Sequence, residues 1–125
     1  MVLGLLSISL KVADIEVSKA FYEKLGFKQM AGHVDQKWVI MKDANDQLIG
    51  LFEGMLKKNM LTFNPGWDAN ARNIDDYIDV RYLQKMLSDK GIDCGQMISE
   101  NSKGPANFMM TDPDGNPILI DQHRQ

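Results

Sequence analysis

The chain has 125 residues, of which 44% are hydrophobic and 25% are charged. These values are ordinary for one globular domain and argue against a disordered or fibrous protein. The net charge is −3 and the basic residues are scattered, so the basic stripe of a nucleic-acid-binding protein is absent. No run of about 18 apolar residues is present either, so no membrane-spanning helix is expected.

Cys94 is the only cysteine, which excludes an internal disulfide and favours a reducing compartment. It has no basic neighbour in the sequence to activate it, so we expect it to be buried and inert. The apolar start MVLGLLSISL lacks a basic n-region and a cleavage site, and it therefore predicts a strand rather than a signal peptide. We expect a cytoplasmic protein with no nucleic-acid and no membrane partner.

The first predicted element is a strand that begins at Leu6 and alternates with period two. Period two predicts one buried face and one face with a different environment. The expected buried set is Leu6, Ile8, Leu10 and Val12. The opposite set is Ser7, Ser9 and Lys11, whose small hydroxyls predict a wetter or roomier space than a core.

A helix is predicted next, over Ile15–Leu25, because Asp14 is a typical N-cap and Gly26 a typical terminating residue. Three short apolar segments follow, and turn residues at 43–46 favour a hairpin between the last two. The segments are Phe27–Met30, Lys37–Met41 and Gln47–Phe52. The first half therefore predicts the order β-α-β-β-β.

The second half has a similar pattern. Asp79 is a second predicted N-cap, the helix is expected over Val80–Lys90, and Gly91 ends it. The expected strands are Met60–Phe63, Ile92–Met97, Ala106–Met110 and Pro117–Gln122, with a strong turn at 112–115. The polar insertion Asp68–Ile78 has no counterpart in the first half, and it is either a functional loop or a solvated one.

Equal spacing connects the two halves. Twelve residues lead from Asp14 to Gly26, and twelve lead from Asp79 to Gly91. An internal repeat explains this agreement. We therefore predict a single α+β domain over residues 1–125, with a first βαβββ module at 1–56 and a second at 57–125.

The segment SISLKVADIEVSKAFYEKLGF resembles the opening of vicinal oxygen chelate proteins, the superfamily of glyoxalase I, extradiol dioxygenases and bleomycin resistance proteins. The segment TDPDGNPILI resembles the closing hairpin of the same superfamily. The resemblance covers essentially the whole chain. It implies that the two modules form a curled, cup-like mixed sheet, with a divalent metal held in the cup, and it implies a homodimer.

The resemblance also implies positions for the metal ligands. The first-strand ligand falls at Ser7, the fourth-strand ligand at Gly50 and the last-strand ligand at Leu119. The remaining ligand falls at Asn64 or, by rigid counting from Asp79, at Arg72. None of these residues is His, Glu or Asp, the side chains that such a metal needs. Other donors, Glu53, His33 and His123, lie away from the family positions and are interpreted as surface residues. We therefore predict no metal and no cofactor.

Without its metal, the cup is expected to bind a small organic molecule on an apolar lining with a few polar groups. The predicted lining is Ser7, Ser9, Trp38, Phe52, Asn64, Trp67, Phe108, Leu119 and Asp121. Two alternatives stay open. One is a glyoxalase- or dioxygenase-like enzyme (a lyase or isomerase) with a rearranged site, and the other is a structural dimer whose cup is filled. The sequence does not decide whether the protein is an enzyme, but metal-dependent glyoxalase activity is not expected.

Overall fold

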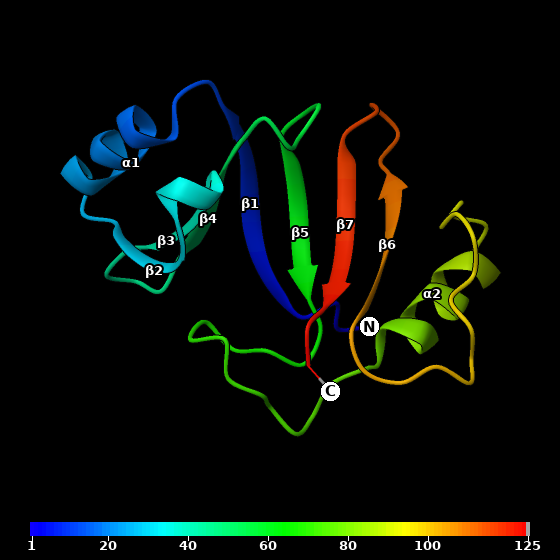
Figure 1. Ribbon diagram of the computed structural model, residues 1–125. Helices are drawn as coiled ribbons and strands as arrows, with labels where there is room; N and C mark the ends of the chain where they lie inside the picture. The colour runs from blue at the N-terminus through cyan, green and yellow to red at the C-terminus, as the bar shows by residue number, and fades with distance from the viewer. Residues whose placement is uncertain (125) are drawn as a thin grey trace. The chain divides into compact units, whose positions relative to one another are not determined.

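A computed structural model describes residues 1–124 of the chain (Figure 1). These residues form two α-helices, one short 3-10 helix and seven strands. The strands form mixed sheets, and the class is α+β, as predicted. The chain divides into two compact units. One unit is Ser7–Met60, and the other combines Met1–Leu6 with the residues from Leu61 onward.

The first unit contains one helix and four strands in the order β2-β3-β4-β1. Its elements are β1 (Leu5–Val12), α1 (Ile15–Lys24), β2 (Lys28–His33), the 3-10 helix η1 (Val34–Gln36), β3 (Trp38–Lys42) and β4 (Leu48–Glu53). β1 is parallel to β4, and the other neighbours are antiparallel. The Asp14 carboxylate accepts hydrogen bonds from the first amides of α1, which confirms the predicted N-cap.

Helix α1 covers one face of this sheet. The core there is built from Ile15, Val39, Met41 and Leu51, with Leu10 and Val12 packed against it. Leu6 and Ile8, on the same side of β1, are 45% and 42% exposed, whereas Ser7 and Ser9 are buried. The prediction for Leu6 and Ile8 is therefore wrong, because the core cluster under α1 includes only the Leu10–Val12 end of β1.

The second unit contains β5 (Met60–Asn64) from Leu61 onward, together with β6 (Ala106–Thr111) and β7 (Pro117–Gln122), in the order β5-β7-β6. β5 is parallel to β7, and β6 is antiparallel to it. Helix α2 (Val80–Asp89) covers one face of this sheet. The core under α2 consists of Val80, Leu83, Leu87, Cys94, Phe108, Met110 and Ile120.

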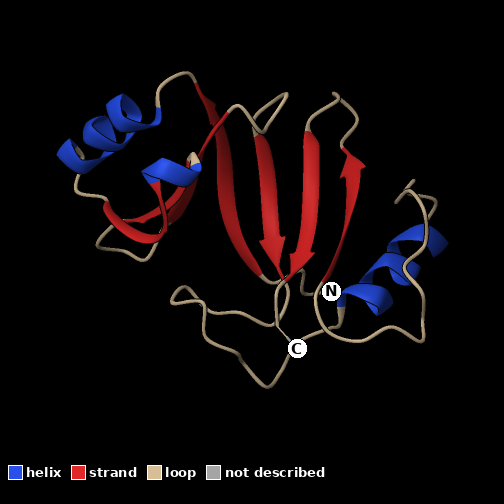
Figure 2. Ribbon diagram, viewed as in Figure 1, coloured by secondary structure: helices blue, strands red, loops and turns tan. Residues whose placement is uncertain are grey.

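The predicted strand Ile92–Met97 is wrong, because this stretch is a loop between α2 and β6 (Figure 2). The fully buried Gln84 side chain holds the loop in place. Its amide nitrogen donates to the carbonyls of Cys94 and Gln96, both at 3.0 Å, and its oxygen accepts from the Ile98 amide at 2.9 Å. These backbone groups therefore have a partner without forming a strand. Cys94 is buried in the core, as expected, and burial raises the pKa of its thiol.

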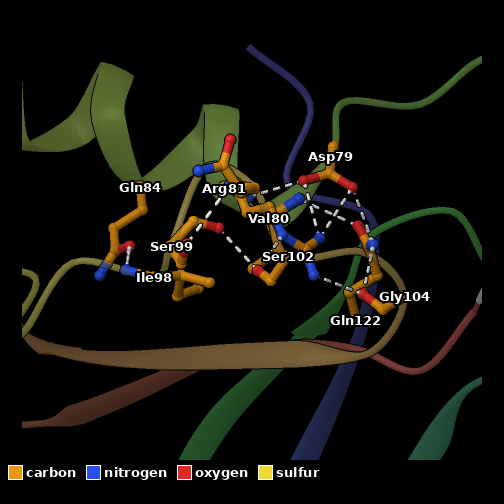
Figure 3. Close-up of polar contacts among 10 residues, drawn as sticks. Asp79, Val80, Arg81, Gln84, Ile98, Ser99, Ser102, Gly104 and Gln122 are labelled. Atoms are coloured by element: carbon orange, nitrogen blue, oxygen red, sulfur yellow. Dashed lines mark hydrogen bonds and ion pairs between the residues drawn. The ribbon is translucent and has the colours of Figure 1, made fainter.

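A polar network fixes the start of α2 (Figure 3). The Asp79 carboxylate accepts from the Arg81 amide at 2.8 Å, and the buried Gln122 oxygen accepts from the Val80 amide at 2.9 Å. The Arg81 guanidinium donates to Ser102 and to the Gly104 carbonyl. These contacts tie α2 to β7 and to the loop before β6. Because the guanidinium N–H groups of Arg81 bond to other residues of the same unit, we assign the network a structural role.

Neither helix in the described part of the chain has the length and apolar character needed to cross a bilayer.

Candidate functional site

The first unit holds two of the positions at which the resemblance implies metal ligands, and neither fits a metal. The register pairs Ser7 with Leu48 and Ser9 with Gly50, which puts these side chains on the face opposite α1. Ser7 offers only a neutral hydroxyl. Gly50 has no side chain, and a Cβ built there would stand 2.6 Å from a ring carbon of Phe52 and 3.2 Å from a methyl of Ile40. The Phe52 ring therefore covers the place that a ligand at position 50 would need.

The strand register identifies the corresponding positions in the second half. Leu119 on β7 pairs with Thr62 on β5, as Gly50 on β4 pairs with Ser9 on β1. Ser7 lies two residues before Ser9, so its counterpart lies two residues before Thr62, at Met60. This result corrects the sequence-based assignment to Asn64 or Arg72. Arg72 was obtained by counting from Asp79, whose distance from the strand is changed by the inserted residues 68–78, and Asn64 was obtained from the predicted strand Met60–Phe63.

Glu53, the one carboxylate close to Gly50 in the sequence, is engaged elsewhere. Its Oε1 accepts a hydrogen bond from the Ile15 amide at 3.0 Å, and its Oε2 lies 3.1 Å from Lys37 Nζ. The Ile15 amide and then Lys37 lower the pKa of Glu53. Its role is to hold the start of α1, on the opposite side of the strand from Gly50.

The four family positions therefore hold Ser7, Gly50, Met60 and Leu119. A hydroxyl and a thioether are poor ligands for hard or borderline divalent metals, and glycine and leucine side chains offer no donor. Within residues 1–124, no three His, Cys, Asp or Glu side chains are close enough together to hold a metal ion. The residues present do not fit the metal that the resemblance implies.

The structure separates the predicted lining residues into three groups. Ser7, Ser9, Trp38 and Phe52 share the face of the first sheet opposite α1. Asn64, Trp67, Leu119 and Asp121 lie in the second unit, and Leu119 and Asp121 point away from α2. Phe108 pairs with Ile120 and is buried under α2. The prediction that Phe108 shares the lining face is therefore wrong, because it occupies the other phase of the strand alternation.

Trp67 and Asp121 meet through a residue that was interpreted as a surface residue, His123. The His123 imidazole stacks on the Trp67 indole with ring centroids 4.9 Å apart and planes 16° apart. His123 Nε2 lies 3.0 Å from Asp121 Oδ2. Trp67 Nε1 donates to Asn73 Oδ1 at 3.1 Å, which orients the indole. We call Trp67, Asp121 and His123 the Trp67 cluster.

Contacts from Arg124 and Asn64 hold the surroundings of the Trp67 cluster. Arg124 Nη1 donates to the carbonyls of Gly66 and Ile74, and the guanidinium lies 4.0 Å from the centre of the Tyr77 ring. Asn64 Nδ2 donates to the Asp121 carbonyl at 2.7 Å. The segment 65–78 is therefore packed against the end of β7 (Figure 1).

Gly66 is required in this arrangement for two reasons. Its φ is +85°, and a Cβ there would stand 2.2 Å from Arg124 Cδ. Glycine adopts such a φ without steric cost, so the Asn-Pro-Gly turn brings Trp67 to the end of β7.

The electrostatics of the Trp67 cluster are dominated by its one ion pair. The hydrogen bond to Asp121 raises the pKa of His123, and partial burial opposes this effect. The His123 side chain is 48% exposed and that of Asp121 is 21% exposed. The cluster thus combines an oriented imidazole, a carboxylate and an aromatic face at an accessible edge.

Sequence reasoning missed His123 because it follows the last strand, Pro117–Gln122, and was taken to be part of a frayed terminus. The signal was nevertheless present. Leu119, Asp121 and His123 are spaced by two residues, so the alternation that placed the first two on one face also applies to the third.

No protein-family model matches the chain, and no curated protein matches it. Solved structures do match. One is a glyoxalase/bleomycin resistance protein/dioxygenase superfamily member from Vibrio splendidus 12B01, with a TM-score of 0.64, 17% identity and coverage of 94% of this chain and 97% of that one. Another is named as an NAD-dependent benzaldehyde dehydrogenase from Legionella pneumophila, with a TM-score of 0.69, 16% identity and coverage of 96% and 100%.

The chain is therefore an α+β protein with mixed sheets, each covered by one helix. Its fold is similar to that of the glyoxalase/bleomycin resistance protein/dioxygenase superfamily member from Vibrio splendidus. This finding confirms the fold implied by the opening and closing motifs. At these identities the likeness extends to the fold alone.

The ion pair in the Trp67 cluster predicts a pH-dependent contribution to stability. The pKa of His123 is raised in the folded protein. Its contribution is therefore complete below the unfolded pKa of about 6.5 and is lost as the pH rises through the folded pKa. We expect Asp121→Asn to lower the free energy of unfolding more at pH 5.5 than at pH 8.5. The difference should stay below about 1 kcal/mol because the pair is partly exposed.

Urea denaturation at the two pH values measures this difference. In a His123→Gln background, Asp121→Asn should have the same effect at both pH values. Equal destabilisation by Asp121→Asn at both pH values in the otherwise unchanged protein would contradict the assignment.

Proposed function

We propose that this protein binds a small, planar organic molecule without the aid of a metal ion. The observation that carries the proposal is the replacement of the family's ligand set by Ser7, Gly50, Met60 and Leu119 in a chain that keeps the fold. An apolar surface with a few oriented polar groups is what small organic ligands require. The face of β5 and β7 opposite α2 fits this description.

The residues on this face favour a planar and cationic ligand. Leu119 provides apolar surface, and Trp67 provides an aromatic edge at the end of β7. The Asp121 carboxylate, with Asp68, Asp75 and Asp76 in the neighbouring segment, favours positive charge. Ser7, Ser9, Trp38 and Phe52 stay predicted ligand contacts.

The two alternatives from the sequence have different support. A glyoxalase- or dioxygenase-like enzyme with a rearranged metal site is disfavoured, because no three His, Cys, Asp or Glu side chains within residues 1–124 could hold a metal ion together. A structural protein with a filled cup is favoured by one observation, the Phe52 ring over Gly50. That contact fills the surface around one position of the first unit, whereas the face of Leu119 carries the Trp67 cluster.

Metal analysis and ligand titration together test the proposed function. After dialysis against Zn, Ni, Mn or Fe salts, we expect far less than one metal equivalent per chain. In the Trp38→Phe variant, Trp67 is the only tryptophan, and proflavine, a planar organic cation, should quench its fluorescence saturably with or without EDTA. One tightly held metal per chain, or quenching that requires metal, would contradict the proposal.

A matched pair of variants locates the binding face. Leu119→Lys places a cation on the proposed surface and should weaken proflavine binding by at least about tenfold, or roughly 1.4 kcal/mol. Leu61→Lys changes the same residue type on the opposite face of β5 and should leave the affinity unchanged.

We also propose that the protein is a homodimer, as the resemblance implies. Val17 and Phe21 on α1 and Leu25, its C-cap residue, follow one another at intervals of four residues and are 66%, 56% and 59% exposed. Such a continuous apolar stripe is typical of an interaction surface, and its self-association would bury it around a twofold axis.

Sedimentation equilibrium at micromolar concentration should give twice the chain mass of 14.1 kDa. Phe21→Glu should shift the protein to the monomer, because a buried unpaired carboxylate is costly. Lys90→Glu, a charge reversal on an exposed residue after α2, is the control and should stay dimeric. A monomer before any substitution would refute the dimer.

A further inference from the structure

His123 and Asp121 form an oriented pair at the edge of the second sheet. Asp121 lies on β7, and His123 directly follows the last residue of that strand, Gln122. Nε2 of His123 lies 3.0 Å from Asp121 Oδ2. No hydrogen bond to Nδ1 is formed within residues 1–124, and the side chain is 48% exposed. In the neutral imidazole, an Nε2–H donated to Asp121 leaves Nδ1 as the acceptor.

A second contact restrains the same imidazole. The Trp67 indole lies nearly parallel to it, and the hydrogen bond from Nε1 to Asn73 holds the indole in turn. The imidazole therefore has its plane set by Trp67 and its tautomer set by Asp121. Such orientation before a ligand arrives is the condition for efficient proton transfer.

We propose that the Trp67 cluster is a metal-independent proton-transfer site, in which His123 Nδ1 is the general base toward a small planar carbon acid. The inference rests on the proposed function, because it uses the same surface. A C–H bond of the bound molecule breaks, and its electron pair stays on the conjugated molecule. The proton forms a new N–H bond at Nδ1, while Nε2–H remains on Asp121.

The imidazolium formed in this step is stabilised from two sides. The Asp121 carboxylate faces its Nε2–H, and the Trp67 ring faces its plane, where a cation is favoured. The proton then returns from Nδ1 to another atom of the bound molecule or to water. The step changes no oxidation state and needs no further reactant.

The charges around His123 agree with this role. Asp121 on β7 is the charged group that acts on the imidazole, and the residue of the segment 65–78 that touches it, Trp67, is neutral. Arg124 directs its guanidinium to Gly66, Ile74 and Tyr77 instead. Asp121 also raises the pKa of His123. The hydrogen bonds from Arg124 already hold the segment 65–78 at the end of β7. His123 is therefore not needed merely to attach this segment.

Elimination of 5-nitrobenzisoxazole, a neutral planar carbon acid, tests the inference. A general base removes the C3 proton, the N–O bond breaks, and the coloured 2-cyano-4-nitrophenolate forms. We expect catalysis that rises with pH through a single ionisation. His123→Gln should lower the rate by about 10²-fold. His33→Gln, which removes the only other histidine, should leave it unchanged. Equal rates in His123→Gln and the unsubstituted protein would overturn the proposal.

A second variant separates catalysis from structural support. Asp121→Asn removes the anionic partner, so the midpoint of the pH–rate profile should move to lower pH in a protein that still folds by circular dichroism. A merely structural role for the pair would leave this midpoint in place, and an unchanged midpoint would overturn the proposal even if His123→Gln failed to fold.

Proflavine titration of the same variants distinguishes this inference from the proposed function. Proflavine binding that persists in His123→Gln, together with lost elimination, supports both. Elimination that depends on His123 without saturable proflavine binding supports the proton-transfer site and refutes the proposed ligand class. Proflavine binding with elimination that does not depend on His123 refutes the proton-transfer site alone.

Discussion

The burial of one sheet face under one helix is the constraint on which each half of this protein depends. α1 covers a core around Val39, Met41 and Leu51, and α2 covers a core around Phe108, Met110 and Ile120. Because strand residues alternate between faces, every second strand residue lies on the helix-covered side. The residues on the opposite face are available for binding or catalysis, and the strand register determines which of them are neighbours.

The same constraint explains how the fold can form without the metal ligands that the resemblance implies. The stabilising apolar clusters lie on the helix-covered faces, whereas Ser7, Gly50, Met60 and Leu119 occupy the other phase of the alternation. Their side chains can change without opening the cores. On the second sheet the freed surface ends at the Trp67 cluster, where a glycine turn brings an indole to the last residues of the chain.

Much of this arrangement could be predicted from the sequence, since its signals are local. Asp14 and Asp79 act as N-caps, and both helices follow them. Signals that depend on tertiary contacts failed. Residues 92–97 are apolar enough for a strand, but the Gln84 side chain bonds the carbonyls of Cys94 and Gln96 instead. Asn64 and Arg72 were predicted instead of Met60 because neither the expected strand bounds nor a count along the insertion gives the strand register. His123 was overlooked because its partners, Trp67 and Asp121, are brought together only by the Gly66 turn.

The central claim is that the face of β5 and β7 binds planar organic molecules without a metal ion. The most direct measurement is a pair of nitrogen–proton NMR titrations of the labelled protein. With proflavine, the account predicts shifts of the Trp67 indole and of the Leu119 and Asp121 amides. With equimolar Zn²⁺ it predicts no shift at Ser7, Gly50, Met60 or Leu119. Zinc-induced shifts at those four amides, with none at the Trp67 indole on addition of proflavine, would contradict it.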